Sequence, residues 1–261
     1  MKKLLIALLV VSSGLMAKDY ALIVSISKYR DNSVPTLSVA KDIERYRNIL
    51  TKFEFRGKPK EFHNSVATKY KILKYIKETA SKIKKDDRFF MFFVGHGTDA
   101  NDEDYGSKLQ ETLPEEYWKD TGMILPYDFN PNKNAIAKSV IIGRRDLRKY
   151  FNKIDKTTQK AFIVFDACFS QNSSKGTRKH NAYSFLHLDT INNTYPYKNI
   201  VYIGASKTQA KTGKLSAVLD SCISKNTTFV SLKGCMNKKL KKSPHRAIVL
   251  SKSDSPMIFA R

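Results

Sequence analysis

The chain has 261 residues, of which 41% are hydrophobic and 11% aromatic, with only 11 glycines and 8 prolines. This composition excludes a disordered chain, a fibrous protein and a linker, and the length is sufficient for one large domain or two small ones. The three cysteines are too few for a disulfide-dense scaffold or for a zinc site with four cysteine ligands.

Residues 1–17 have the pattern of a bacterial secretory signal. Lys2 and Lys3 form a short positive region, residues 4–15 are an apolar run, and Ala17 is a small residue at the expected cleavage point. An uncleaved anchor is the alternative, but the run is short for a span of about 20 residues. We therefore expect a cleaved signal peptide and one mature domain, residues 18–261, that is periplasmic or secreted and has no membrane span.

The chain carries a large positive charge. Its 47 lysine and arginine residues exceed its 24 acidic residues and give a formal net charge of +23. Such a charge attracts nucleic acid, anionic lipid or acidic protein. The lysines are spread along the whole chain, however, without an aromatic-interleaved RNA motif or a helix-turn-helix. We interpret them as a solvated surface and expect no nucleic-acid partner.

Buried strands and amphipathic helices alternate along the chain, and residues 98–127 are irregular and acidic. Near-continuous apolar runs of this kind are typical of a mostly parallel sheet covered by helices on both faces, which predicts an α/β domain. Strands are predicted at 20–26, 89–94, 161–165, 200–203 and, as a short last strand, near 257–259. Helices are predicted around 43–53, 68–83 and 144–154, and after Gly213.

Polar residues follow three of the predicted strands directly. His96 comes after the second strand, Asp166 and Cys168 after the third, and Ser206 after the fourth. Ligands of open parallel sheets bind beyond the carboxyl ends of the strands. These four residues are therefore the first candidates for a site.

His96 and Cys168 are the residue types of a base and a nucleophile. A thiolate attacks a carbonyl carbon, and a neutral imidazole takes the thiol proton and later protonates the leaving amine. The backbone N–H groups of Gly97 and Cys168 are candidates for stabilising the oxyanion. Taken alone, Cys168 reads as a core thiol and His96 as a hydrogen-bonded loop residue. Their shared position at two strand ends favours the catalytic interpretation.

Four segments of the chain carry recognisable motifs: 20–24 with Tyr29, Leu37 and Asp42, then 92–97, 122–128 and 162–170. In this order they resemble the motifs of caspase-like cysteine peptidases. The resemblance extends over nearly the whole mature chain. It implies a caspase-hemoglobinase fold, a three-layer α/β/α sandwich with a mostly parallel six-stranded sheet whose last strand is antiparallel. It also implies that His96 and Cys168 form a dyad that hydrolyses peptide bonds in a peptide or protein substrate.

Asp166 indicates the branch of this family. Caspases that cleave after aspartate have glutamine at this position, whereas metacaspases, clostripain and gingipains have aspartate and cleave after arginine or lysine. A carboxylate at the floor of a pocket pairs with a cation and rejects an acid. The metacaspase pattern has a second pocket carboxylate at Asp42, although an ordinary acid in the first turn of a helix is the alternative. Ser206 is a further candidate for substrate binding.

The sequence departs from the family pattern at two places near the predicted pocket. Gln171 replaces a common glycine after the cysteine motif, and Lys211 lies where an acid often follows the fourth strand. These differences concern the shape of the pocket and leave the dyad unchanged.

An acidic loop follows the histidine motif. Metacaspases bind calcium near such residues, so Ca²⁺ is a candidate activator, although the reaction requires no cofactor. Calcium takes about six to eight oxygen ligands, and the loop has no EF-hand spacing. A solvated acidic loop is the favoured alternative. The weak calcium candidates are Asp99, Asp102, Glu103 and Asp104.

Cys222 and Cys235 are candidates for a disulfide. In an oxidising periplasm they would pair and leave Cys168 as the odd thiol, whereas two core cysteines are the alternative.

A basic loop after the cysteine motif is a candidate for self-processing. Family members commonly mature by a cut between the cysteine strand and the next strand. Small polar residues there are typical of an exposed loop that is readily nicked, although an ordinary solvated basic loop is the alternative. The candidate cleavage positions are Lys175, Arg178 and Lys179.

The leading hypothesis is thus a secreted or periplasmic cysteine endopeptidase that cleaves after arginine or lysine. Two alternatives belong to other functional classes. One is a catalytically silent caspase-like binding module, and the other is a basic surface protein that binds nucleic acid or anionic lipid, for which binding would depend steeply on salt.

Overall fold

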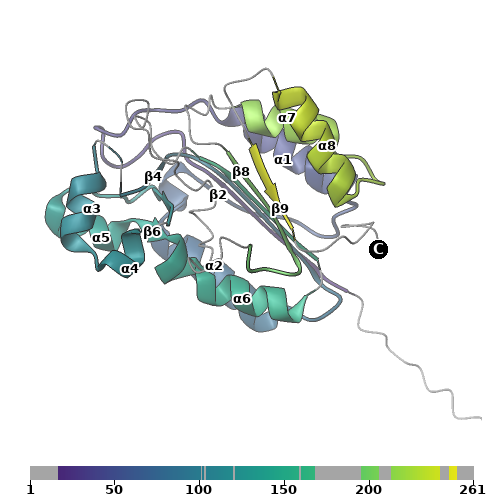
Figure 1. Cartoon of the computed structure of the whole chain (residues 1–261), viewed down its shortest axis with the longest axis horizontal. Coiled ribbons are helices and arrows are strands. Elements are labelled where there is room, and N and C mark those ends of the chain that lie inside the picture. The colour runs from purple at the N-terminus through teal and green to yellow at the C-terminus, as the bar shows by residue number, and fades with distance from the viewer. Residues whose placement is uncertain are drawn as a thin grey trace, which may run out of the picture.

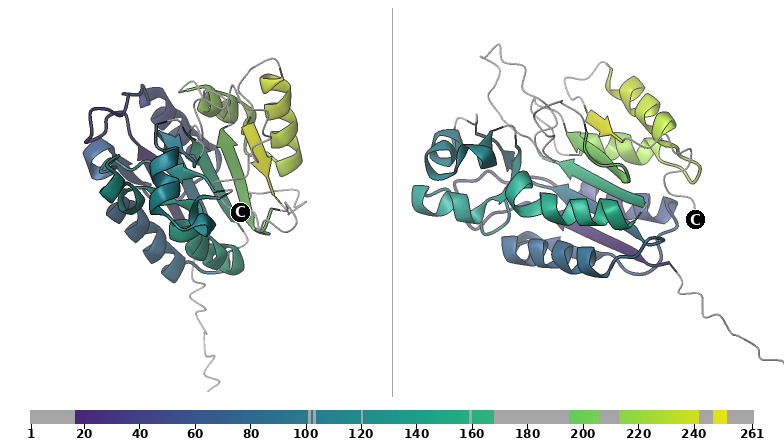
Figure 2. Two further views of the ribbon diagram at one scale, coloured as in Figure 1. Left: turned by 60° about the vertical axis from the view of Figure 1, so that its left-hand side comes forward. Right: turned by 60° about the horizontal axis from the view of Figure 1, so that its bottom comes forward.

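The structure is a computed structural model, and a six-stranded sheet with helices on both faces forms its centre (Figure 1, Figure 2). This arrangement confirms the three-layer α/β/α architecture expected from the sequence. The structure describes residues 17–100, 102, 104–119, 121–158, 160–167, 195–205, 213–241 and 247–251, and the structural statements below concern these residues.

The main sheet has the strand order β2-β1-β3-β7-β8-β9. The first five strands in this order are parallel, and β9 is antiparallel to β8, as expected. The central strand β3 is buried along its whole length, which explains its uninterrupted run of apolar residues. The strands are β1 (Asp19–Ser25), β2 (Lys60–His63), β3 (Arg88–Val94), β7 (Lys160–Asp166), β8 (Ile200–Ala205) and β9 (Ala247–Leu250).

Alternate side chains of the strands pack into two separate cores, one on each face of the sheet. On one face, Leu22 and Val24 of β1 contact the apolar sides of α2 (Lys69–Lys82) and α6 (Arg148–Thr157). On the other face, Ala21 and Ile23 lie with α1 (Ala40–Lys52), α7 (Lys214–Cys222) and α8 (Phe229–Leu240). Figure 1 shows α1, α7 and α8 above the sheet and α2 and α6 below it.

A second, three-stranded sheet begins directly after His96. Its order is β4-β5-β6, and both strand pairs are antiparallel. The expectation that residues 98–127 are irregular was therefore wrong in part, because strands of two residues and helices of four to seven are too short to show a period. The elements are β4 (Gly97–Thr98), α3 (Gly106–Thr112), α4 (Glu115–Trp118), β5 (Met123–Ile124), α5 (Lys133–Ser139) and β6 (Ile141–Ile142).

Two further elements differ from the sequence prediction. The sixth strand is Ala247–Leu250, earlier than the expected strand near 257–259, and the latter residues lie outside the described part of the chain. The helix expected from Arg144 begins as a π-helical turn, Gly143–Leu147, before α6. The 3-10 turn Asn64–Val66 and the edge strand β2 had no clear signal in the sequence.

Cys222 of α7 and Cys235 of α8 form a disulfide, with their Cα atoms 5.7 Å apart. The pairing favoured from the sequence is thus present in the structure. Of the three cysteines in the chain, Cys168 is the one outside this bond. No helix in the described ranges has both the length and the apolar character needed to cross a bilayer.

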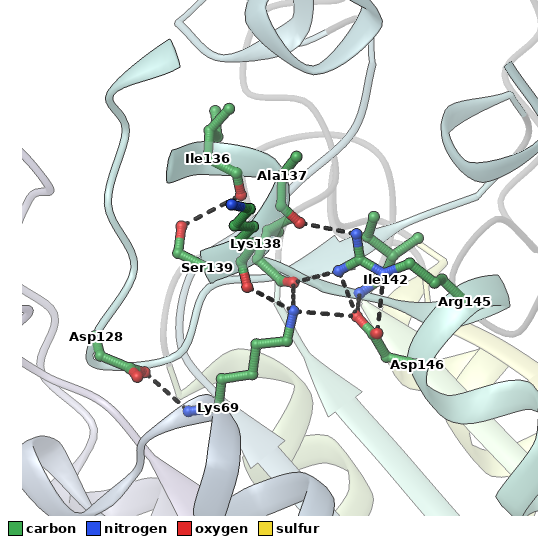
Figure 3. Close-up of polar contacts among 10 residues, drawn as sticks. Lys69, Asp128, Ile136, Ala137, Lys138, Ser139, Ile142, Arg145 and Asp146 are labelled. Carbon is green, nitrogen blue, oxygen red and sulfur yellow. Dashed lines mark hydrogen bonds and ion pairs between the residues drawn. The ribbon is translucent and has the colours of Figure 1, made fainter. Parts of the chain in front are cut away.

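A partly buried polar cluster attaches the second sheet to α2 (Figure 3). The Nζ group of Lys69 donates hydrogen bonds to the carbonyl oxygens of Lys138 and Val140, at 2.8 and 2.7 Å, and lies 3.5 Å from Asp146. Arg145 binds the same Asp146 carboxylate through two nitrogens and also donates to Val140 O. Burial lowers the pKa of Lys69, and the charge of Asp146 opposes this shift. The cluster thus fixes α5 and β6 against the first turn of α2.

We expect Lys69→Met to lower the free energy of unfolding by about 1–3 kcal/mol, because the carbonyl groups of Lys138 and Val140 lose a charged donor and Asp146 loses one of its cations. Urea denaturation of the purified protein measures this change. Lys77→Met on the exposed side of the same helix is the matched control and should change stability by less than about 0.5 kcal/mol. Equal effects of the two substitutions would contradict a structural role for the cluster.

Candidate functional site

His96 lies at the carboxyl end of β3, between the main sheet and the second sheet. The preceding Gly95 allows this turn because any side chain there would meet the ring of Phe93 and the hydroxyl of Tyr29, each 3.0 Å from a Cβ atom. The Gly95 N–H group donates to the carbonyl oxygen of Asp166 at 3.4 Å. The end of β3 is therefore connected to the end of β7.

Three hydrogen bonds hold His96 in position. Its backbone N–H donates to the Tyr29 hydroxyl at 2.7 Å, its carbonyl accepts from Leu125 N–H at 3.0 Å, and its ring Nε2 lies 2.9 Å from the carbonyl oxygen of Pro35. A carbonyl oxygen accepts hydrogen bonds and cannot donate them, so Nε2 carries the proton in this contact. The second ring nitrogen, Nδ1, is then the basic one.

The environment of His96 favours its neutral form. The residue is 8% exposed, and burial lowers the pKa of the imidazole, with the hydrogen bond to Pro35 and the charge of Asp102 acting in the opposite direction. A neutral imidazole with a free lone pair on Nδ1 is able to accept a proton at neutral pH.

Asp166 and Asp42 form a buried acidic pair on the other side of the sheet end. Asp166 is 4% exposed and accepts a hydrogen bond from the Tyr46 hydroxyl at 3.1 Å. Asp42 is 1% exposed, and its Oδ1 accepts from the Ser216 hydroxyl. Its other oxygen, Oδ2, is buried and has no hydrogen-bond partner among the described residues. Residues from β7, α1 and α7 therefore meet at this acidic pair.

Burial and mutual repulsion make this pair hard to ionise. Burial, followed by the charge of Asp42, raises the pKa of Asp166 to about 7. Burial also raises the pKa of Asp42. The pKa of Tyr46 lies well above its ordinary value, so the phenol stays protonated and donates to Asp166. A cation placed between the two carboxylates would offset the cost of ionising them and lower both pKa values.

Arg45 partly compensates the pair from within the protein. Its guanidinium lies 3.9 Å from Asp42 Oδ1 and donates to the Ser216 hydroxyl at 3.1 Å and to the Gly213 carbonyl at 2.8 Å. The side chain of Arg45 is 28% exposed, so much of its charge is screened by water. Gly213 has φ of 87°, a backbone conformation that favours glycine.

The sequence did not identify three residues of this network. Tyr46 lies within the helix predicted around residues 43–53, and its ring stacks on Phe92, with the ring centroids 4.8 Å apart. Its hydroxyl, however, reaches Asp166. Arg45 and Ser216 had no motif that marked them. The spacing of three residues between Asp42 and Arg45 was a weak signal that the two side chains are neighbours on one helix face.

The register of the main sheet brings the histidine and cysteine strands together. β3 and β7 are adjacent and parallel, and Val94 is aligned with Asp166. His96 and Cys168 each lie two residues beyond this aligned pair. Ala167 is the last described residue before Cys168. Several predicted site residues lie outside the described ranges: Cys168, Ser206, Glu103, Lys175, Arg178 and Lys179.

The acidic loop makes contacts within itself. Asp102 accepts hydrogen bonds from the backbone N–H groups of Asp104 and Tyr105, at 2.9 and 3.1 Å, just before α3. Burial raises the pKa of Asp102. Asp99 is 8% exposed. Across the ranges given above, no three His, Cys, Asp or Glu side chains are grouped to hold a metal ion.

The raised pKa of Asp166 predicts a dependence of stability on pH. An unfolded aspartate ionises near 3.8, whereas folded Asp166 ionises near 7, so the folded state retains a proton between these values. Stability contributed by this group is therefore lost as pH rises from about 4 to about 7, by an amount on the order of 4 kcal/mol.

Urea denaturation at a series of pH values should show that Asp166→Asn gains stability relative to the wild type as the pH rises through this window. Asp86→Asn is the control, because Asp86 is exposed and precedes β3 at the other end of the sheet. Parallel pH profiles for the wild type and Asp166→Asn would show that Asp166 ionises in the ordinary range.

Comparisons with known proteins agree with this architecture. Residues 18–253 match the family model described as the caspase domain. The search of curated proteins finds no match to this sequence. The fold is similar to the crystal structure of protein GSU0716 from Geobacter sulfurreducens, with a TM-score of 0.58 and 14% identity, covering 94% of this chain and 97% of that chain. It is also similar to the Drosophila initiator caspase Dronc, with a TM-score of 0.52 and 10% identity, covering 93% and 81%.

Proposed function

This chain belongs to the caspase-domain family, and we propose that it is a periplasmic or secreted cysteine endopeptidase with Cys168 as nucleophile and His96 as general base. The observation that carries the proposal is the pairing of β3 with β7. It aligns Val94 with Asp166, the last residues of the two strands. His96 and Cys168 each come two positions later in the sequence. The buried, neutral imidazole at the end of β3 supports the same function.

The proposed reaction begins with a proton transfer from the Cys168 thiol to Nδ1 of His96. The thiolate attacks the carbonyl carbon of the scissile peptide bond, and the backbone N–H groups of Gly97 and Cys168 stabilise the oxyanion. His96 then returns the proton to the leaving amine, and water hydrolyses the thioester. The hydrogen bond from Nε2 to the carbonyl oxygen of Pro35 keeps the proton on Nε2, so Nδ1 is available for these proton transfers.

We propose further that the enzyme cleaves after arginine or lysine. The buried carboxylates of Asp166 and Asp42 lack a full complement of positive charge, and Asp42 Oδ2 accepts no hydrogen bond in the described part of the chain. An arginine or lysine side chain of the substrate would supply both the charge and the missing donors. The carboxylate of an acidic substrate residue would be repelled there.

Calcium activation through the acidic loop and self-cleavage after Lys175, Arg178 or Lys179 stay predictions from the sequence. The loop contacts of Asp102 are accounted for by the turn before α3, which weakens the case for calcium. Ser206 likewise stays a candidate for substrate binding.

Removal of either dyad residue should abolish hydrolysis. We expect Cys168→Ala and His96→Ala to lower kcat/KM for fluorogenic peptides by at least about a thousandfold, because each removes a group that acts in every turnover. His63→Ala is the matched control, since His63 lies at the far edge of the sheet on β2. Hydrolysis at the wild-type rate by a folded Cys168→Ala protein would exclude the proposed mechanism, whereas a folded wild type that hydrolyses none of these peptides would favour a binding module.

Substrates that differ at the residue before the cut test the specificity. We expect arginine and lysine peptides to be cleaved faster than aspartate or glutamine peptides, and Asp166→Asn to lower kcat/KM for arginine by roughly 30-fold to 5000-fold. The ratio of arginine to glutamine cleavage should fall as the pH drops below about 7, where Asp166 takes up a proton. A preference for aspartate peptides would contradict the proposed cleavage after arginine or lysine. This assay concerns the specificity alone, and the dyad is tested by the substitutions above.

A further inference from the structure

The chain is held firmly at a point just before the first strand. The backbone N–H of Lys18 donates to Asp87 Oδ1 at 2.7 Å, and the carbonyl of Lys18 accepts from the N–H of Arg88 at 2.9 Å. Asp87 is 4% exposed, and its second oxygen accepts from the N–H of Lys84 at 2.8 Å. A buried carboxylate therefore lies against the nitrogen atom of Lys18, while β1 itself begins only at Asp19.

We propose that Asp87 is the binding site for the α-ammonium group of Lys18, which is released when the signal peptide is cut between Ala17 and Lys18. In this hydrolysis a leader peptidase adds water across the peptide bond. The carbon–nitrogen bond breaks, Ala17 leaves as a carboxylate, and the nitrogen of Lys18 becomes an ammonium group. The proposal rests on the predicted signal peptide and is independent of the peptidase activity of the protein.

The charge change at this nitrogen strengthens an existing contact. The amide of the uncut chain offers one neutral donor, whereas the ammonium group offers three donors and a full positive charge. Hydrogen bonds between charged partners are roughly twice as strong as those between neutral ones, and burial reduces their screening. Asp87 is also connected to the neighbouring strand, because its carbonyl accepts a hydrogen bond from the Thr158 hydroxyl before β7.

The nearest buried cation does not compete for this carboxylate. The guanidinium of Arg88 is bound to both oxygens of Asp19, at 2.8 and 2.7 Å, and donates to the carbonyls of Phe53 and Glu54. The carboxylate of Asp87 thus binds the nitrogen of Lys18, whereas the carboxylate of Asp19 forms an ion pair with Arg88.

The geometry selects one cleavage position. A cut one residue earlier would leave the ammonium group on Ala17, about 3.8 Å further along the chain from the atom that contacts Asp87. A cut one residue later would remove the contacting nitrogen together with Lys18. Ala17, immediately before this bond, matches the small last residue of the A-x-A-like cleavage pattern, whereas Leu15 departs from its first small position.

A double-mutant cycle tests the pairing. Four proteins combine two amino termini, Lys18 itself or Gly-Ala placed before Lys18, with Asp87 or Asp87→Asn. With Asp87, the Gly-Ala extension should lower the urea midpoint by roughly 0.5 M, and with Asp87→Asn it should have less than half this effect. The same extension tested on Asp86→Asn, an exposed neighbour, should behave as on the wild type. Equal shifts with and without the Asp87 carboxylate would overturn the proposal.

Two further measurements need no substitution of Asp87. Acylation of the Lys18 α-amine at pH 7 should be at least about tenfold slower in the folded chain than in a peptide with the same amino terminus, because pairing with a carboxylate raises the pKa of an amine. Equal rates would overturn the proposal. Amino-terminal sequencing of the protein exported by its cell should begin at Lys18, and a different first residue would exclude the site.

Discussion

The parallel pairing of β3 with β7 is the contact on which the site depends. Both strands are buried on both faces, so their register is set by the packing of aromatic and aliphatic side chains such as Phe93 against Phe165. A shift of one residue would turn every side chain to the opposite face of the sheet. The same register aligns the ends of the two strands and brings His96 close to the chain that leads to Cys168.

The two sides of this sheet end have opposite electrostatic character. On the side of His96, hydrogen bonds that His96 donates to the Tyr29 hydroxyl and to the Pro35 carbonyl satisfy its polar groups, so the imidazole is held in one orientation at little electrostatic cost. On the side of Asp166, two carboxylates are buried together with incomplete compensation. Such strain is tolerated at functional sites when a ligand relieves it. On the proposed function, this asymmetry separates His96, which would transfer a proton, from Asp42 and Asp166, which would bind a cation.

The sequence predicted those parts of the molecule that follow from long, regular apolar patterns. Runs such as Phe89–Val94 have no polar interruption, and the four central strands were identified for this reason. The second sheet was missed because its strands have two residues each and depend on tertiary contacts such as those of Lys69. His96, Asp166 and Asp42 were selected because they follow strands or match a family motif. Arg45 and Ser216 were not, because their role arises from a contact between α1 and α7, far apart in the sequence.

The bond between Cys222 and Cys235 gives reducing agents two opposed effects on this protein. On the proposed mechanism Cys168 must be a free thiol, and a reductant protects it from oxidation. The same reductant opens the bond that joins α7 to α8, a crosslink for which a loop of this size contributes about 3 kcal/mol. Because α7 carries Ser216, which donates a hydrogen bond to Asp42, a displacement of this helix would disturb the acidic pair. We therefore expect an upper limit to the useful concentration of reductant: enough to keep Cys168 reduced, but too little to break the bond between Cys222 and Cys235.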